Sequence, residues 1–164
     1  MYLGQPPICH NVVVNNAEHN ELVDTIRDWA KALGFQDIGF TGIELNEHEA
    51  YLQKWLDAGY HGTMDWMDRH GTKRSRPSEL VPGTCTVISC RMDYQPEAKD
   101  AWQVLDTSDK GFVSRYAVGR DYHKIIRSRL SKLADRIRSE LGSGDFRAFV
   151  DSAPVLERAI AEQS

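Results

Sequence analysis

The sequence predicts an α/β fold, a mixed-sheet sandwich with flanking helices that is incomplete at its C-terminal end. Three observations support this prediction. A chain of 164 residues suits a single buried core. Apolar residues at helical spacing alternate along the chain with short apolar runs that are typical of strands. The clearest of these runs, residues 84–92, has no polar face, as expected of a central strand.

The first part of the chain is expected to hold an arm, a helix and a strand. Residues 1–16 form the arm, because they contain turn formers and show no period, and the domain occupies residues 17–164. Gly34 is well placed to end the first helix, and a strand is predicted at 35–40. That helix is predicted from four apolar residues at helical spacing: Leu22, Ile26, Trp29 and Leu33.

Two further helices and a long loop are predicted next. Asn46 with Glu49 three residues later has the form of a capping box, which predicts a helix running to Gly59. Thr63 is expected to cap a shorter helix. Residues 74–83 contain two prolines and no hydrophobic period, so we expect a turn-rich loop there.

The C-terminal part is expected to hold the longest helix and the last strand. Residues 122–141 predict an amphipathic helix, with six apolar positions at Tyr122, Ile126, Leu130, Leu133, Ile137 and Leu141. Residues 146–150 read as a strand that stops at Asp151, and a helix with Pro154 in its first turn follows. Such corners are where α/β proteins place their chemistry. The alternative is that Asp151 only caps the helix.

Composition narrows the class of protein. The longest apolar runs are too short to span a bilayer, and the first residues lack the basic start and apolar stretch of a signal peptide. We therefore expect a cytoplasmic protein that makes no membrane contact. The three cysteines show no Cys-x-x-Cys spacing, so this chain alone is not expected to ligate an iron–sulfur cluster. The histidines and cysteines form no zinc-like cluster, and we predict no metal ligands.

Charge divides the chain into two unequal parts. Residues 1–68 carry 11 acids and 3 bases, a net charge of −8, whereas residues 69–164 carry 13 acids and 17 bases, a net charge of +4. The bases concentrate at 69–76 and 115–138. This pattern is compatible with an RNA partner, and equally with a solvated helix face.

Several strings of the sequence together resemble one enzyme family. They are Ser-Arg-Tyr-Ala-Val-Gly-Arg-Asp-Tyr-His-Lys at 114–124, Phe-Val-Asp-Ser-Ala-Pro-Val-Leu-Glu at 149–157, and Tyr-His-Gly-Thr-Met-Asp-Trp-Met-Asp-Arg-His-Gly at 60–71. Arg-Ser-Arg-Pro at 74–77 and Leu-Val-Pro-Gly at 80–83 complete the set. The order and content of these strings resemble epoxyqueuosine reductase, the cobalamin-dependent enzyme of tRNA queuosine synthesis, over about residues 22–162.

The resemblance implies an activity, cofactors and partners. The family reduces an epoxide on a modified tRNA base to an alkene, using cobalamin and two four-iron clusters whose ligands are absent from this sequence. It also implies a mixed sheet related to cobalamin- and flavin-reductase folds. We expect an N-terminal portion of such an enzyme, truncated before its ferredoxin-like part or served by a separate one. We expect it to be a monomer that is inactive in isolation and to have tRNA as its substrate.

Asp151 and His123 are the expected catalytic residues. By its place in the second string, Asp151 matches the proton donor of the family, and the resemblance implies that it also contacts the cofactor. Burial beside an apolar ring would favour its protonated form, whereas helix N–H groups would favour the anion, and the sequence leaves this open. His123 matches an active-site histidine that orients the substrate or relays a proton. A lone histidine could equally face solvent.

Tyr122 and Arg74 are the other expected cofactor contacts. Tyr122 would pack on the corrin ring, or simply enter the core. Arg74 matches an arginine that would hold the periphery of the cofactor, because guanidinium donors suit amides and phosphates. A solvated loop arginine is the alternative, and Arg76 is an equal rival.

Two other functions fit parts of the sequence. A stand-alone corrinoid-binding module without catalysis would explain the missing cysteine motif. An RNA-binding adapter would use the basic residues of 115–138, but the negative net charge of −4 disfavours it.

Overall fold

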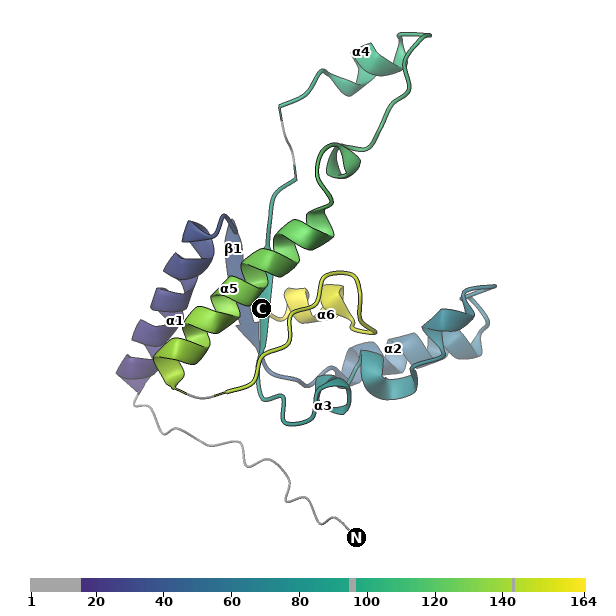
Figure 1. Ribbon diagram of the computed structural model, residues 1–164. Coiled ribbons are helices and arrows are strands. Elements are labelled where there is room, and N and C mark those ends of the chain that lie inside the picture. Colours follow the sequence, from purple (N-terminus) through teal and green to yellow (C-terminus); the bar gives the residue numbers. More distant parts are fainter. Residues whose placement is uncertain (1–15, 95–96, 143) are drawn as a thin grey trace.

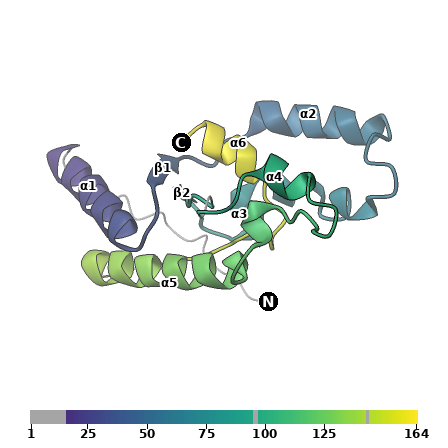
Figure 2. The same cartoon turned by 90° about the horizontal axis from the view of Figure 1, so that it is seen from above.

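A two-stranded antiparallel sheet lies at the centre of the protein, with helices on both of its sides (Figures 1 and 2). The computed structural model describes residues 16–94, 97–142 and 144–164. Strand β1, Asp37–Thr41, pairs with β2, Val87–Arg91. Residues 1–15, nearly all of the predicted arm, lie outside the described residues. The structure is therefore a mixed helix and sheet fold, while the larger mixed sheet of a sandwich stays a prediction.

The helices follow the chain in a simple order. The α-helices are α1 (Asn16–Ala32), α2 (Asn46–Asp57), α3 (Pro77–Leu80), α4 (Ala101–Leu105), α5 (Tyr122–Leu141) and α6 (Glu157–Glu162). Three short 3₁₀ helices are η1 (Asp65–Met67), η2 (Gly71–Arg74) and η3 (Arg115–Ala117). In the described residues, no helix is both long enough and apolar enough to pass through a bilayer.

One face of the sheet packs against α1 and α5. The strands alternate, so Ile38 and Phe40 of β1 share a face with their partners Cys90 and Ile88 of β2. This face meets the larger core cluster, whose buried members are Ile26, Ala30, Phe35, Ile38, Leu133 and Ile137. The helical spacing of the α1 and α5 members is what brings them to one side of each helix.

The opposite face of the sheet packs against α6. Val87 joins a second cluster around the buried residues Leu45, Ala159 and Ile160. Ser164 approaches Gly39 so closely that a side chain at this position would collide with it. Because only glycine leaves this space, Gly39 permits the contact between α6 and the sheet.

Helix α5 has the bounds that its apolar period predicts. Asp121 caps its start by accepting the backbone N–H of His123 at 3.0 Å. Gly142 ends it in the left-handed conformation, with φ of 67°. Leu133 and Ile137 are buried against the sheet. The predicted first helix, the strand at 35–40 and the strand at 84–92 are also present, each with shorter or shifted bounds.

The predicted strand at 146–150 is wrong. This segment pairs with no strand in the part of the chain that the structure describes, and its apolar side chains are placed by packing instead: Val150 is buried, and Phe146 lies against the larger cluster. A short apolar run does not reveal whether a pairing partner exists.

The predicted helix start at Pro154 is also wrong. Backbone bonds from Val155 to the carbonyl of Ala153 at 2.9 Å, and from Leu156 to that of Arg74 at 3.0 Å, hold this stretch outside a helix until Glu157.

The predicted capping box at the start of α2 is wrong as well. The N-cap is Leu45, which makes no side-chain cap bond. Asn46 instead donates to Glu44, and Glu49 binds Ser75 and Arg76. Because the Glu49 carboxylate accepts hydrogen bonds from these two distant residues, it does not cap the start of α2.

Candidate active site

The Asp151 loop adopts a conformation that few residues tolerate. Asp151 has φ of +48°, and no other non-glycine residue in the described ranges has a positive φ. Aspartate enters this region more readily than most residues but still at a cost. The loop is held at both sides: the backbone N–H of Asp151 donates to Glu157 Oε1 at 3.2 Å, and Arg127 Nη2 donates to Ser152 Oγ at 3.1 Å. The carboxyl group of Asp151 therefore occupies a fixed and half-exposed position.

The first turn of α5 brings two predicted site residues to this carboxylate. The Tyr122 hydroxyl donates to Asp151 Oδ2 at 2.5 Å, and His123 Nε2 lies 3.8 Å from the same oxygen. The two rings stack with centroids 4.0 Å apart. Helix α5 and the loop after residue 150 thus bring Asp151, Tyr122 and His123 into one cluster, which we call the Asp151 cluster.

Asp121 orients the imidazole of His123. Its Oδ1 lies 3.0 Å from His123 Nδ1 and also accepts the backbone N–H of His123. The side-chain hydrogen bond with His123 lowers the pKa of Asp121 most, and the backbone hydrogen bond lowers it further. With Nδ1–H donating to Asp121, the other nitrogen, Nε2, faces Asp151 at 3.8 Å, which is longer than a direct hydrogen bond.

The charge of Asp151 affects two neighbours. The hydrogen bond to the Asp151 carboxylate raises the pKa of Tyr122 to about 12, so its hydroxyl stays a donor at neutral pH. The pKa of Glu157 is raised by burial and, secondly, by the negative charge of Asp151. The arrangement therefore favours the protonated forms of Tyr122 and Glu157 beside one carboxylate.

Aromatic rings extend from the Asp151 cluster toward the segment that carries α4. Tyr116 meets Tyr122 edge-on with centroids 6.1 Å apart, and Tyr94 meets Tyr116 at 6.5 Å. Tyr94 and Tyr116 are exposed. In Figure 1 this segment stands away from the body, and exposed Trp102 lies on it. The cluster therefore opens onto apolar surface as well as onto solvent.

Arg74 lies in a different environment. Its side chain is buried, donates from Nε to the Met67 carbonyl at 2.9 Å and from Nη2 to the Trp66 carbonyl at 2.8 Å, and packs on the Trp66 ring. Burial lowers the pKa of its guanidinium. Arg74 is thus joined to the backbone of η1 and is not brought into the Asp151 cluster. Its role as a cofactor ligand stays a prediction.

Arg76, the rival of Arg74, is also engaged within the chain. It binds both oxygens of Glu49, from Nη2 at 2.7 Å and from Nε at 3.0 Å, and donates from Nη1 to Glu79 at 3.0 Å. Thr72 adds a bond to Glu79 at 2.6 Å. These bonds tie η2 and α3 to α2.

Three contributors to the cluster were not predicted. Glu157 closes the second family-like string, and Asp121 immediately precedes Tyr122 in the first, so their positions in the strings were the available signal. Arg127 lies one helical turn after His123, which places both on one side of α5. Its bond to Ser152 joins residues 25 apart in sequence, and no local pattern predicts such a pair.

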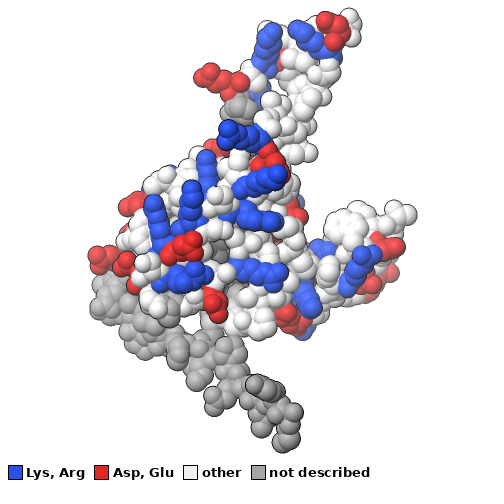
Figure 3. Space-filling model, viewed as in Figure 1, with Lys and Arg blue, Asp and Glu red and all other residues white. Residues whose placement is uncertain are grey.

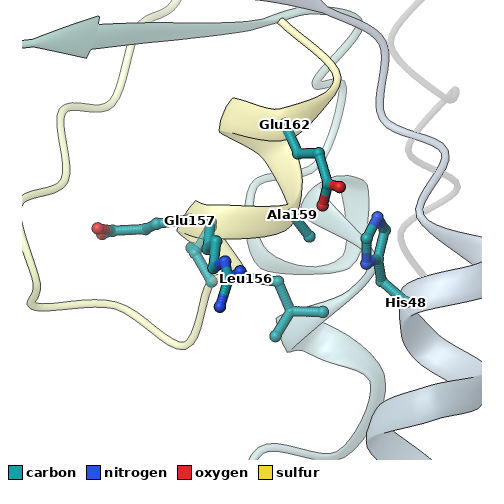
Figure 4. A pocket seen from close by; sticks show the side chains of 7 residues that line it. His48, Leu156, Glu157, Ala159 and Glu162 are labelled. Carbon is teal, nitrogen blue, oxygen red and sulfur yellow. The ribbon is translucent and has the colours of Figure 1, made fainter.

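One hollow adjoins the Asp151 cluster only through Glu157. It has a volume of about 450 Å³ between α2 and α6 and is lined by His48, Val155, Leu156, Glu157, Arg158, Ala159 and Glu162. Figure 4 shows His48 and Glu162 on one side, while Glu157 points away from them. Its lining includes neither Tyr122, His123 nor Asp151. Within the ranges that the structure describes, no three histidine, cysteine or acidic side chains are grouped to hold a metal ion.

Comparison with protein families identifies the relatives of this chain. The family model described as Epoxyqueuosine reductase QueG, DUF1730, matches residues 74–152. An epoxyqueuosine reductase of Pseudomonas aeruginosa is 64% identical over 143 residues, which are 87% of this chain and 40% of that protein. One from Aliivibrio fischeri is 52% identical over 146 residues, 89% of this chain and 39% of that protein. The chain thus spans about two fifths of the length of the relatives it matches.

Solved structures agree with the fold. An epoxyqueuosine reductase crystallised with an epoxyqueuosine-modified tRNA-Tyr stem loop matches with a TM-score of 0.70 and 26% identity, over 87% of this chain and 38% of that one. The Bacillus subtilis enzyme, with its catalytic aspartate loop swung out of the active site, matches with a TM-score of 0.66 and 26% identity, over 87% of this chain and 37% of that one.

Proposed function

Because the chain belongs to the epoxyqueuosine reductase family, we propose that it supplies the proton-donating and cobalamin-binding part of an oxidoreductase that converts epoxyqueuosine in tRNA to queuosine. The observation that carries this proposal is the Asp151 carboxylate, held 2.5 Å from the Tyr122 hydroxyl on a strained loop and faced by His123. Strained residues of this kind concentrate at active sites. In a related structure, the loop described as catalytic also carries an aspartate.

The reaction needs an acid at the epoxide oxygen. Removing that oxygen breaks two C–O bonds and consumes two electrons and two protons, which yields an alkene and one water. An oxygen that leaves as an alkoxide is a poor leaving group. Protonation by Asp151 would remove this obstacle, and general acids of this kind accelerate reactions about 10²–10⁴-fold.

We expect His123 to reprotonate Asp151 and Tyr122 to limit when Asp151 can donate its proton. His123 faces Asp151 through Nε2 while Asp121 holds its other nitrogen, so it can return a proton to the carboxylate after each cycle. Tyr122 donates its hydroxyl proton to Asp151 Oδ2 in this structure. Its hydroxyl must turn toward another acceptor, or the carboxyl must be covered, before Asp151 acts as an acid.

The exposed aromatic surface suits cobalamin. Tyr116 and Tyr122 offer ring faces and edges to a large macrocycle, and the carboxyl group of Asp151 lies beside them. When bound there, reduced cobalamin supplies the electrons. Arg74 would hold the cofactor through Nη1, since Nε and Nη2 already bind carbonyl groups. The spacing of Cys9, Cys85 and Cys90 does not fit a four-iron cluster, and we derive no step through one.

A hybrid protein tests the proposed function. The matching 143 residues of the Pseudomonas aeruginosa relative are replaced by this chain, and the hybrid is expressed in a strain that lacks its own reductase. Mass spectrometry of tRNA nucleosides then measures queuosine against epoxyqueuosine. We expect queuosine to be restored by the hybrid, and the rate to fall by about 10²–10⁴-fold with Asp151→Asn.

Asp145→Asn is the matched control, because Asp145 is exposed, lies six residues before Asp151 and makes no ion pair among the described residues. Normal turnover by the Asp151→Asn hybrid, with wild-type protein level, would refute the acid role.

A corrinoid-binding module without catalysis is the second candidate, favoured by the lack of cysteine-ligand spacing. Absorbance titration of the chain with cob(II)alamin separates the two. Saturable binding together with a hybrid that makes no queuosine would support the module, whereas binding together with turnover supports the reductase.

A further inference from the structure

We propose that the outward surface of α5 binds the phosphate backbone of an RNA stem. This surface, the α5 basic face, consists of Lys124, Arg127, Lys132, Arg136 and Arg138. The inference rests on the proposed function only in its choice of RNA as the ligand. It concerns a surface outside the Asp151 cluster.

The α5 basic face lies opposite the core. Leu133 and Ile137 are buried on the sheet side of the helix, whereas all five basic side chains are exposed. Figure 3 shows lysine and arginine side chains crowded over the region where Figure 1 places α5, with few acidic groups among them. A continuous positive surface of this kind is what a polyanion needs.

Three of these cations remain available for a ligand. Arg127 donates to Ser152, and Arg138 pairs with Asp135 at 2.9 Å. Within the described ranges, Lys124, Lys132 and Arg136 make no ion pair. Arg138 also offsets Asp135. Two further acids border the face, Asp121 beside Lys124 and Glu140 one turn after Arg136, and the bases of α5 outnumber its acids.

The α5 basic face is positive because the charged residues are distributed unevenly over the helices. Helix α5 carries six bases and two acids, a net charge of +4. Helix α1 carries four acids and two bases, and α2 carries three acids and one base, a net charge of −2 for each. An approaching polyanion is therefore attracted to α5 and repelled from α1 and α2.

The position of the helix favours an RNA stem over an acidic protein. Helix α5 begins at the Asp151 cluster with Tyr122 and His123, and Lys124 follows directly. From Lys124 to Arg136 the helix rises about 18 Å, a length along which a duplex presents many phosphates. If a nucleobase of the RNA is bound at the Asp151 cluster, the RNA stem that carries it would lie beside the α5 basic face. Stems are recognised largely by shape and by phosphate and sugar contacts, and a structural relative was crystallised with a tRNA stem loop.

The test measures RNA binding without catalysis. Fluorescence anisotropy follows the binding of a labelled, unmodified anticodon stem loop to the chain and to the hybrid protein, over a series of salt concentrations. We expect the triple variant Lys124→Ala, Lys132→Ala, Arg136→Ala to bind about 10–100-fold more weakly. The slope of log K against log salt should become shallower by about 2–3, because each lost phosphate contact removes about 0.7–0.9.

A matched triple variant controls for net charge. Lys31→Ala, Lys54→Ala, Arg91→Ala removes the same number of cations away from α5, and we expect little change in affinity. Equal losses in both triple variants, or an unchanged salt slope in the α5 variant, would overturn the proposal. Polyglutamate that competes as well as unlabelled stem loop would assign the surface to an acidic protein instead. Circular dichroism verifies the fold of each variant.

Because this assay needs no cobalamin and no epoxide, it separates the two proposals. Salt-dependent RNA binding by a hybrid that makes no queuosine would refute only the proposed function. Turnover by the triple variant at the wild-type rate and KM would refute only the α5 surface.

Discussion

The Asp151 cluster and the Arg74–Arg76 region both lie within strings that resemble one family, but their polar groups are used differently. In the cluster, Tyr122 and His123 point at a single half-exposed carboxylate. In the other region, Arg74 binds backbone carbonyls and Arg76 binds Glu49 and Glu79. A charged residue in a motif is therefore not a ligand by its type alone. What decides its role is whether its hydrogen-bonding groups are already satisfied within the chain.

The largest expected effect is the loss of stability when Arg74 is removed. Arg74→Ala leaves the carbonyls of Trp66 and Met67 without their partner and opens a space beside the Trp66 ring. Each of these part-buried carbonyls left unsatisfied costs up to about 1–3 kcal/mol, so we expect a loss of roughly 2–5 kcal/mol in the free energy of unfolding. Arg74→Lys should recover only part of it, because one ammonium cannot reproduce the planar fork.

Urea denaturation measures this loss, with Arg69→Ala as an exposed control from the same basic stretch. A stable Arg74→Ala protein that no longer binds cob(II)alamin would reverse the comparison, since Arg74 would then be a cofactor ligand rather than a structural residue.

The helix α5 illustrates what the sequence could predict. Six apolar positions and a terminal glycine fix its bounds, because an amphipathic helix carries its information locally. The segment 146–150 shows the limit. Whether an apolar run becomes a strand depends on a partner elsewhere, and here packing of Phe146 and Val150 takes its place.

The candidate site also has residues that the sequence predicted and residues that only the fold brings together. Asp151, Tyr122 and His123 were named from the family-like strings, but the bond between Tyr122 and Asp151 joins residues 29 apart and follows from the tertiary fold. The support from Arg127 and Glu157 was missed for that reason. Each is an ordinary helix residue in sequence, and only the fold brings them to the loop.

A smaller effect is expected from the backbone of Asp151. Asp151→Ala and Asp151→Gly both remove the carboxylate, but only glycine accepts a φ of +48° without steric cost. We expect the glycine variant to be more stable than the alanine variant by about 1 kcal/mol. Thermal unfolding of the two proteins measures the difference. Equal stabilities would indicate that the loop relaxes freely and that Asp151 is not held under strain.

The titration of Tyr122 tests the hydrogen bond at the centre of the cluster. Its pKa of about 12 arises because the Asp151 carboxylate stabilises the protonated phenol. Tyrosinate absorbance, taken as the difference between wild type and Tyr122→Phe, should show this group titrating near 12, and nearer 10 in Asp151→Asn. The folded state keeps its proton longer, so this contribution to stability is lost as pH rises between about 10 and 12. A wild-type value near 10 would contradict the contact.

The smallest effect is expected in the Arg74–Arg76 region, at Glu49. Hydrogen bonds from Arg76 and Ser75 lower the pKa of Glu49, so the folded state favours its carboxylate. This stabilisation is present above the usual carboxyl value of about 4.3 and is lost as pH falls below it. Glu49→Gln should therefore weaken the protein slightly at neutral pH and make its stability less dependent on pH below the usual carboxyl value of about 4.3. Glu47→Gln, on the exposed side of the same helix, should change neither. If Glu49→Gln left the stability at acidic pH unchanged, the ion pair between Glu49 and Arg76 would contribute nothing measurable to the free energy of unfolding. Only the hydrogen bonds of Arg74 would then distinguish this region from the Asp151 cluster.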